Sequence, residues 1–169
     1  EPGIAFGTGT HETTRLCMEF LEEFVTPGCV MLDVGCGSGI LSIAALLLGA
    51  ESAVGVDIDP LAVETAEQNA AGNHVEERFH GILGSLTDNV SGRFDLVAAN
   101  LVADAVIRLT ENIGNFMADG AVFLMSGIIP EREKEVRDSL RGKFRILERG
   151  EENGWVALAA EPEPAVRRL

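Results

Sequence analysis

The stretch 33–39, which reads Asp-Val-Gly-Cys-Gly-Ser-Gly, limits the possible folds of this chain more than any other stretch. The apolar run 30–34 leads into it and predicts a buried strand, and the apolar run 40–48 follows it and predicts a helix. A strand that turns through glycines into a helix presents N–H groups and the positive end of the helix dipole to a ligand. Glycine has no Cβ atom, so a ligand can approach this main chain closely. The stretch therefore predicts a ligand-binding turn.

The nearest alternative is the dinucleotide fingerprint G-x-G-x-x-G. Gly35 and Gly37 match its first two glycines, but Ile40 stands at the third position and the glycine comes one residue earlier, at Gly39. The acidic residue before the turn, Asp33, also departs from the usual dehydrogenase pattern. The pattern D-x-G-x-G-x-G resembles the first motif of methyltransferases that use S-adenosyl-L-methionine. A turn without a ligand is less well supported, because one glycine usually suffices for a turn.

The charge balance restricts the partners of the chain. Its 169 residues suit a single domain, and the formal net charge is −14, with only two lysines, Lys134 and Lys143. Such a chain should repel phosphate backbones, so we expect no direct nucleic-acid binding. A basic partner would be attracted, although solubility alone also explains the acidity.

Cysteine and histidine usage argues against a disulfide framework and a metal site. Three cysteines, an odd number, form no C-x-x-C pair, which favours a reducing compartment, and we expect a cytoplasmic protein. The three histidines are scattered, so no metal site is predicted. No apolar run approaches the ~20 residues of a membrane span, and no signal peptide is recognisable. The chain opens on Glu-Pro without methionine, which suggests a fragment.

The order of predicted elements indicates an α/β sheet. Strands are expected at 30–34, 52–57, 79–83, 94–99 and 121–125, with helices over 10–24, 40–48, 60–69, 102–116 and 131–140. Two last strands, 144–147 and 155–159, are joined by the polar turn 151–154. We predict a mostly parallel Rossmann-like sheet with one antiparallel edge strand and helices on both faces. One catalytic domain should span 1–160, followed by a flexible tail, 161–169, and no second domain is expected.

Two polar residues end predicted strands at the carboxyl edge, where ligands bind in such sheets. Asp57 lies 20 residues after Gly37, a spacing that suits a carboxylate accepting both ribose hydroxyls of a nucleotide-like ligand. The alternative role of capping the helix that begins at Pro60 is better served by Asp59.

Asn100 ends the fourth predicted strand. Methyl transfer to nitrogen needs a neutral amine, whereas a free lysine has a pKa near 10.4. The side-chain carbonyl of Asn100 and a neighbouring main-chain carbonyl could select the neutral amine and orient it, and placement supplies much of the rate. A simple turn residue is the alternative interpretation.

Four segments in order resemble the bacterial methyltransferase family of large-subunit ribosomal protein eleven. They read Phe-Gly-Thr-Gly-Thr-His-x-Thr-Thr at 6–14, Asp-Val-Gly-Cys-Gly-Ser-Gly-Ile-Leu at 33–41, Gly-Val-Asp-Ile-Asp-Pro at 55–60 and Ala-Asn-Leu at 99–101. The similarity covers roughly residues 1–160. It implies a class I methyltransferase fold and methylation of ε-amino and α-amino groups of a ribosomal protein. By motif match, the cofactor S-adenosyl-L-methionine contacts Thr14, Gly35, Asp57 and Asn100, with Phe6, Thr8 and Gly37 nearby, and Asn100 with Leu101 serves the acceptor.

Three departures from the family pattern matter. The usual Asn-Ile-Leu is Asn-Leu-Val at 100–102, and the third strand ends without an acidic residue for the adenine amino group, at 83–85. We expect this chain to lack the N-terminal domain with which the family grips its substrate, to keep cofactor binding and to have weaker target choice. Residues 101–102 offer no aromatic platform for a planar base or amide, which favours an aliphatic amine.

The leading hypothesis is a protein N-methyltransferase acting on a lysine, or an N-terminal amine, of a basic ribosomal protein, with no nucleic-acid or membrane partner. Another protein or a small molecule as acceptor, and a non-catalytic S-adenosyl-L-methionine-binding module, stay open as alternatives. A nicotinamide oxidoreductase is the least supported alternative.

Overall fold

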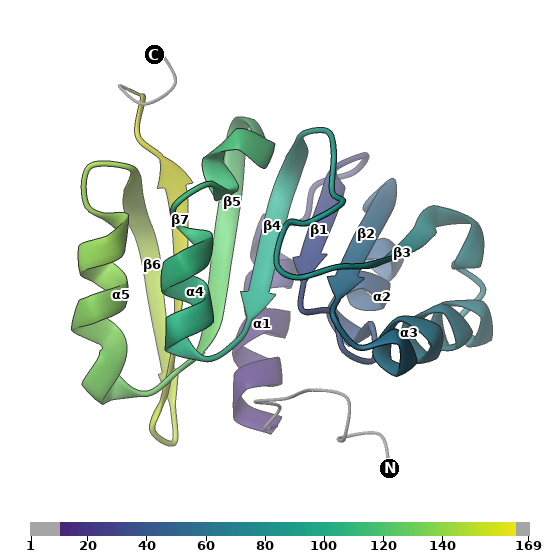
Figure 1. Cartoon of the computed structure of the whole chain (residues 1–169), viewed down its shortest axis with the longest axis horizontal. Coiled ribbons are helices and arrows are strands. Elements are labelled where there is room, and N and C mark those ends of the chain that lie inside the picture. The colour runs from purple at the N-terminus through teal and green to yellow at the C-terminus, as the bar shows by residue number, and fades with distance from the viewer. Residues whose placement is uncertain (1–10, 165–169) are drawn as a thin grey trace.

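The computed structural model describes residues 11–164, and over this range seven strands form a single sheet with helices on both faces (Figure 1). The strands are β1 (Val30–Val34), β2 (Ser52–Asp57), β3 (Phe79–Leu83), β4 (Phe94–Asn100), β5 (Met117–Ile128), β6 (Phe144–Glu152) and β7 (Trp155–Pro162). The α-helices are α1 (His11–Phe24), α2 (Ile40–Leu47), α3 (Pro60–Gly72), α4 (Ala103–Leu109) and α5 (Glu133–Leu140). Short 3-10 helices are η2 (Glu76–Arg78), η3 (Ile113–Phe116) and η4 (Pro130–Arg132).

The strand order β3-β2-β1-β4-β5-β7-β6 places the reversal of the sheet between β1 and β4. Strands β1 to β5 pair in parallel, so the carboxyl ends of β1, β2 and β4 lie at one edge, the lower edge in Figure 1. Open α/β sheets bind ligands at this reversal, outside the carboxyl ends of the strands. The predicted fold class is confirmed.

The antiparallel strand of the sheet is β7, which lies between β5 and β6. After β5 the chain crosses through α5 to β6, which lies one strand position away from β5. The hairpin then brings β7 back between β5 and β6. The predicted tight turn is confirmed. Glu152 pairs with Trp155 across Asn153 and Gly154, whose φ angles are +50° and +82°. Two left-handed residues in a two-residue loop match the twist of paired strands.

Several boundaries differ from the prediction. β5 runs from Met117 to Ile128, and β7 continues to Pro162, two residues past the expected domain end. Glu161 pairs with Arg145 there, so positions 161–162 belong to the sheet and not to a tail. β6 extends to Glu152, five residues past the predicted end at 147, because its mostly charged residues 148–152 resemble a loop in the sequence. The helix expected over 102–116 divides into α4 and η3, because Thr110, Asn112 and Gly114 are poor helix formers.

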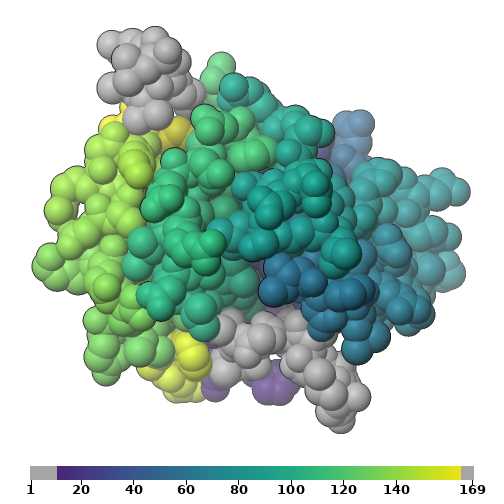
Figure 2. Space-filling model, in the orientation of Figure 1, coloured from purple at the N-terminus to yellow at the C-terminus, as the bar shows by residue number. Residues whose placement is uncertain are grey.

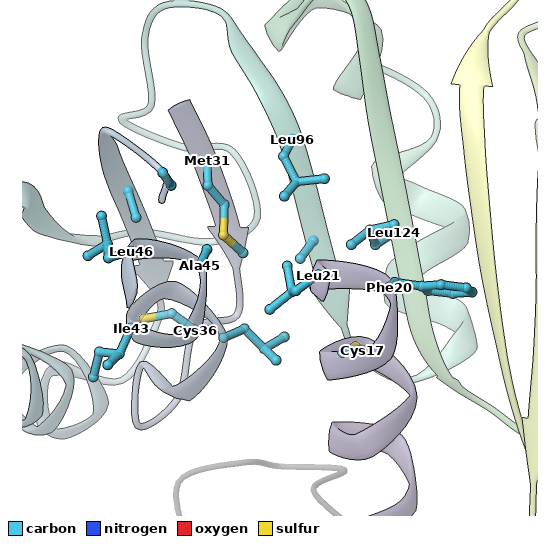
Figure 3. Packing of buried hydrophobic residues seen from close by; sticks show 14 of the residues in the cluster. Cys17, Phe20, Leu21, Met31, Cys36, Ile43, Ala45, Leu46, Leu96 and Leu124 are labelled. Atoms are coloured by element: carbon cyan, nitrogen blue, oxygen red, sulfur yellow. The ribbon is translucent and has the colours of Figure 1, made fainter. Parts of the chain in front are cut away.

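The core divides into two layers according to the two faces of the sheet. Neighbouring residues of a strand alternate between the layers: Met31 packs on the side of α1 and α2, and Leu32 on the side of α4 and α5. Figure 3 shows the α1 side, where Cys17, Phe20 and Leu21 lie against Leu96 of β4 and Leu124 of β5. Figure 2 is seen from the opposite side, with the green surface of α4 and the lime surface of α5 on the left. The blue surface on the right is α3, whose Ala66 and Ala70 pack in the same layer as α1 and α2. Within residues 11–164, every helix is too short or too polar to span a membrane.

Candidate active site

The glycine turn joins β1 to α2 at the sheet reversal. Gly35, Gly37 and Gly39 all have positive φ angles, +70°, +54° and +85°. The amides of Gly35 and Cys36 donate to the Val56 carbonyl oxygen at 2.7 and 3.0 Å, which extends the pairing of β1 with β2. β2 thus occupies the amides of Gly35 and Cys36, and the expectation that N–H groups of the turn face a ligand stays a prediction for the rest of the turn. The turn also offers a main chain that lacks Cβ atoms at its glycines.

Asp57 ends β2 with its carboxylate directed at the glycine turn. The Gly37 amide donates to its Oδ2 at 2.9 Å, and the Asp59 amide donates to its Oδ1 at 3.0 Å. Each carboxylate oxygen can accept a further hydrogen bond, so two ribose hydroxyls could still be bound. Asp59 caps α3, because its Oδ1 accepts from the Leu61 amide at 2.9 Å. The predicted capping role of Asp59 is confirmed, and the ribose-binding role of Asp57 stays a prediction.

Asp33 of the glycine motif points into the core. The Ser42 hydroxyl donates to its Oδ2 at 2.7 Å, and both residues are buried. Burial raises the pKa of Asp33 to about 6, the hydrogen bonds from Ser42 oppose this shift, and the charge of Asp57 adds to it. The carboxylate thus ties the first turn of α2 to β1. Sequence reasoning missed Ser42, because nothing in the local pattern distinguishes it from another helical serine.

Asn100 and Leu101 lie beside the glycine turn, across the sheet reversal. Asn100 is the last residue of β4 and is 8% exposed. The Leu101 side chain covers Gly35: a Cβ atom on Gly35 would lie 2.4 Å from Leu101 Cδ2. A Cβ atom at this position would require the Leu101 side chain to move, and the φ of +70° also favours glycine. The structure thus brings the predicted acceptor residues against the predicted cofactor turn.

Thr14 lies in the first turn of α1, and its hydroxyl oxygen is buried without a hydrogen-bond partner among residues 11–164. A buried polar atom without a partner is costly, and a ligand can supply one. The neighbouring Thr13 carbonyl accepts from the buried Ser126 hydroxyl of β5 at 3.2 Å, so this turn is anchored beside the end of β5. The predicted contacts Phe6 and Thr8 lie outside the described residues.

The end of β3 borders the site with an apolar surface. Leu83 pairs with Asp57 in the sheet and is 51% exposed, and Ile58 is 68% exposed. These two side chains are suited to contact with an aromatic ring. β3 contains no acidic residue, and the carboxylate in its pairing with β2 is that of Asp57.

Cysteine nucleophiles and metal ligands are not assembled in the described part of the chain. Cys17, Cys29 and Cys36 are free and buried, and burial raises the pKa of Cys17 to about 12 and also raises that of Cys36. Residues 11–164 contain no group of three or more His, Cys, Asp or Glu that could hold a metal ion. The polar side chains described for this site are therefore the Asp57 carboxylate, the Asn100 amide and the Thr14 hydroxyl.

The comparisons with known proteins agree on one family. The family model "Ribosomal protein L11 methyltransferase (PrmA)" matches residues 1–163. Ribosomal protein L11 methyltransferases of Caldanaerobacter subterraneus subsp. tengcongensis and Carboxydothermus hydrogenoformans are each 45% identical to this chain, over 160 and 164 residues. These matches cover 94% and 96% of this chain but 51% and 54% of the relatives, so the chain spans about half of their length.

Solved structures agree with this result. The structure of ribosomal protein L11 methylase from Lactobacillus delbrueckii subsp. bulgaricus has a TM-score of 0.89 at 32% identity, and the match covers 92% of this chain and 81% of that one. The tRNA methyltransferase TrmK of B. subtilis has a TM-score of 0.73 at 17% identity, covers 86% of this chain and 65% of that one, and supports the fold alone. From the family model and the relatives together, the chain belongs to the ribosomal protein L11 methyltransferase family.

Proposed function

We propose that this chain binds S-adenosyl-L-methionine and transfers its methyl group to amines of ribosomal protein L11, with lysine side chains as the main acceptors and the N-terminal amine as a further one. The observation that carries the proposal is the meeting of Asp57, the glycine turn and Asn100 at the sheet reversal, in a chain of this family. Bound S-adenosyl-L-methionine would supply an electrophilic methyl group on a sulfonium.

The cofactor side of the site consists of Asp57, Thr14 and the glycine turn. The Asp57 carboxylate, held by the Gly37 and Asp59 amides, would accept the ribose hydroxyls. The buried Thr14 hydroxyl lacks a partner within residues 11–164 and would gain one. Gly37 would let the ligand approach the main chain next to Gly35, which Leu101 covers, and Ile58 with Leu83 would contact the adenine ring. Phe6 and Thr8 complete the proposed contacts.

The acceptor side consists of Asn100 and Leu101. The Asn100 side-chain carbonyl and the Leu101 main-chain carbonyl would accept the N–H groups of a neutral amine and orient its lone pair. A fixed orientation avoids the entropic cost of encounter, and the proton of the amine can leave to water before transfer. Val102, 53% exposed, provides no aromatic platform, which supports an aliphatic amine as acceptor.

The charge of the chain supports a basic protein as acceptor. A net charge of −14 attracts basic proteins and repels nucleic acids. Three free, buried cysteines are consistent with a reducing compartment, and we propose the cytoplasm.

Radiolabelled methyl transfer tests the proposal. The chain is incubated with labelled S-adenosyl-L-methionine and purified L11 protein, and the full-length Carboxydothermus relative shows that the acceptor is competent. We expect label in L11, and the Asn100→Ala variant should lose more turnover than cofactor affinity. Cofactor binding without transfer, while the relative is active, would favour a non-catalytic binding module. If another protein or a small molecule is labelled and L11 is not, that molecule is the acceptor in place of L11.

A further inference from the structure

The main chain of β5 presses against the acceptor segment, Asn100 and Leu101, at Gly127. A Cβ atom at position 127 would lie 2.6 Å from the Leu101 carbonyl oxygen and 3.2 Å from Asn100 Oδ1. Gly127 also has a φ of +86°, a conformation that side chains disfavour. Both the space and the backbone conformation therefore require glycine at this position.

This contact lies at an irregularity of the sheet. Ser126 pairs with Asn100 across β4 and β5, and the pairing of β5 with β7 shifts register between Met125 and Ile128. The Leu101 amide donates to the Ser126 carbonyl oxygen at 3.1 Å. Bulges beside active sites bend a strand and redirect neighbouring groups. The bend at 126–127 thus brings β5 against the two carbonyl groups that would accept the amine.

The opposite side of the acceptor segment is also occupied. The Leu101 side chain fills the space over Gly35 of the glycine turn. The segment is therefore enclosed between the cofactor turn on one side and the bent β5 on the other. A side chain added at Gly127 would have to displace the Leu101 carbonyl or the Asn100 side-chain amide.

We propose that Gly127 is a positioning residue for methyl transfer, which keeps the Asn100 and Leu101 carbonyls directed at the acceptor amine. This inference rests on the function proposed above. Nothing about Gly127 in the sequence predicts the role, because the predicted strand ends at 125 and residues 126–128 fall in the unassigned stretch before the helix over 131–140. The consequence is specific: changes at Gly127 should slow transfer far more than they weaken cofactor binding, since Asp57, the proposed ribose ligand, lies on β2 and is held by the Gly37 and Asp59 amides.

The test compares Gly127→Ala and Gly127→Asn with Gly120→Ala in single-turnover transfer to L11 at saturating cofactor. Gly120 lies on the same strand with a φ of +78°, and an added Cβ atom would have no other atom within 4 Å, so its variant carries the backbone strain without the contact. Asparagine adopts positive φ more readily than alanine, so Gly127→Asn keeps the contact with less strain. Calorimetry gives the dissociation constant for S-adenosyl-L-methionine, and thermal unfolding monitors the fold.

We expect both Gly127 variants to transfer about 100-fold more slowly, the effect of displacing a reacting group by about 1 Å, with cofactor affinity within about threefold of the parent chain. Transfer rates equal to that of Gly120→Ala would overturn the inference, as would parallel losses of rate and cofactor affinity or failure of both variants to fold. An inactive parent chain beside an active full-length relative would instead count against the proposed function.

Discussion

Among single residues, the carboxylates of Asp57 at the end of β2 and of Asp59 just after it have separate tasks. Asp57 receives the Gly37 amide and faces the glycine turn, whereas Asp59 receives the Leu61 amide and caps α3. Their side chains are chemically identical, so the pair provides a matched comparison between ligand binding and helix capping.

Asp57→Ala should weaken S-adenosyl-L-methionine binding by about 1–3 kcal/mol, because the ribose hydroxyls and the Gly37 amide lose their acceptor. Asp59→Ala should leave this affinity unchanged and lower the free energy of unfolding by about 0.5–2 kcal/mol, the contribution of an N-cap. Calorimetric titration and urea unfolding of both variants measure the two effects. An unaltered dissociation constant in Asp57→Ala would exclude the ribose contact.

The buried Asp33 makes stability depend on pH. Its folded pKa is raised to about 6, above its value in the unfolded chain, mainly by burial. The stabilisation that a protonated Asp33 provides is therefore complete below the unfolded pKa, about 3.9, and is lost as the pH rises through about 6.

Asp33→Asn should remove this dependence, since the amide stays neutral and its oxygen can still accept from Ser42. Relative to the parent chain, the variant should gain about 3 kcal/mol in free energy of unfolding between pH 4 and pH 7, the equivalent of the pKa shift. Urea unfolding of both proteins at several pH values measures the difference. A constant difference from pH 4 to pH 7 would show that Asp33 titrates normally.

Between elements, an ion-pair cluster joins α5 to β6. Glu133 of α5 accepts from Arg137 Nε at 2.9 Å and from Arg149 Nε and Nη2 of β6 at 2.8 and 2.9 Å. The hydrogen bonds from Arg149, followed by those from Arg137, lower the pKa of Glu133. This stabilisation is present above the ordinary glutamate pKa and is lost as the pH falls through the lowered value.

Glu133→Gln should therefore lower the free energy of unfolding by about 1 kcal/mol at neutral pH, and less in 1 M salt, because salt screens the pairs. Lys134→Gln is the matched control, since Lys134 pairs with Asp138 within α5 and is highly exposed. Its loss should be about 0.3–0.5 kcal/mol. Thermal unfolding at two salt concentrations distinguishes the variants, and equal losses would mean that the link to β6 adds nothing.

For the molecule as a whole, the site gathers residues from α1, β1, β2, β4 and the turns that follow them, so ligand binding should stabilise the entire fold. A ligand that binds only the folded state at 100 times its dissociation constant adds about 2.7 kcal/mol. For a chain of this size we expect S-adenosyl-L-methionine to raise the unfolding midpoint by about 5–10 °C.

Thermal scans with S-adenosyl-L-methionine and with NADH at the same concentration check this expectation. The glycine spacing departs from the dinucleotide fingerprint, so NADH should leave the midpoint unchanged. A larger shift with NADH would revive the oxidoreductase interpretation.

Features that depend on near neighbours in the chain could be predicted from the amino-acid sequence. Apolar runs located β1, β2 and β3, the Asn153–Gly154 pair marked the hairpin turn, and Asp59 before Pro60 marked the start of α3. These signals are local, because periodicity, capping and turn chemistry act over a few residues. The position of Asp57 at a strand end, 20 residues after Gly37, belongs to the same class.

The meeting of distant groups could be seen only in the folded chain. Folding directed the turn amides to Val56, buried Asp33 against Ser42, placed β7 inside the edge strand β6, and brought Gly127 and Gly35 against the acceptor segment. Each of these contacts depends on strand order, register and the sign of φ at a glycine, which are settled by packing across the sheet and leave no periodic trace along the chain.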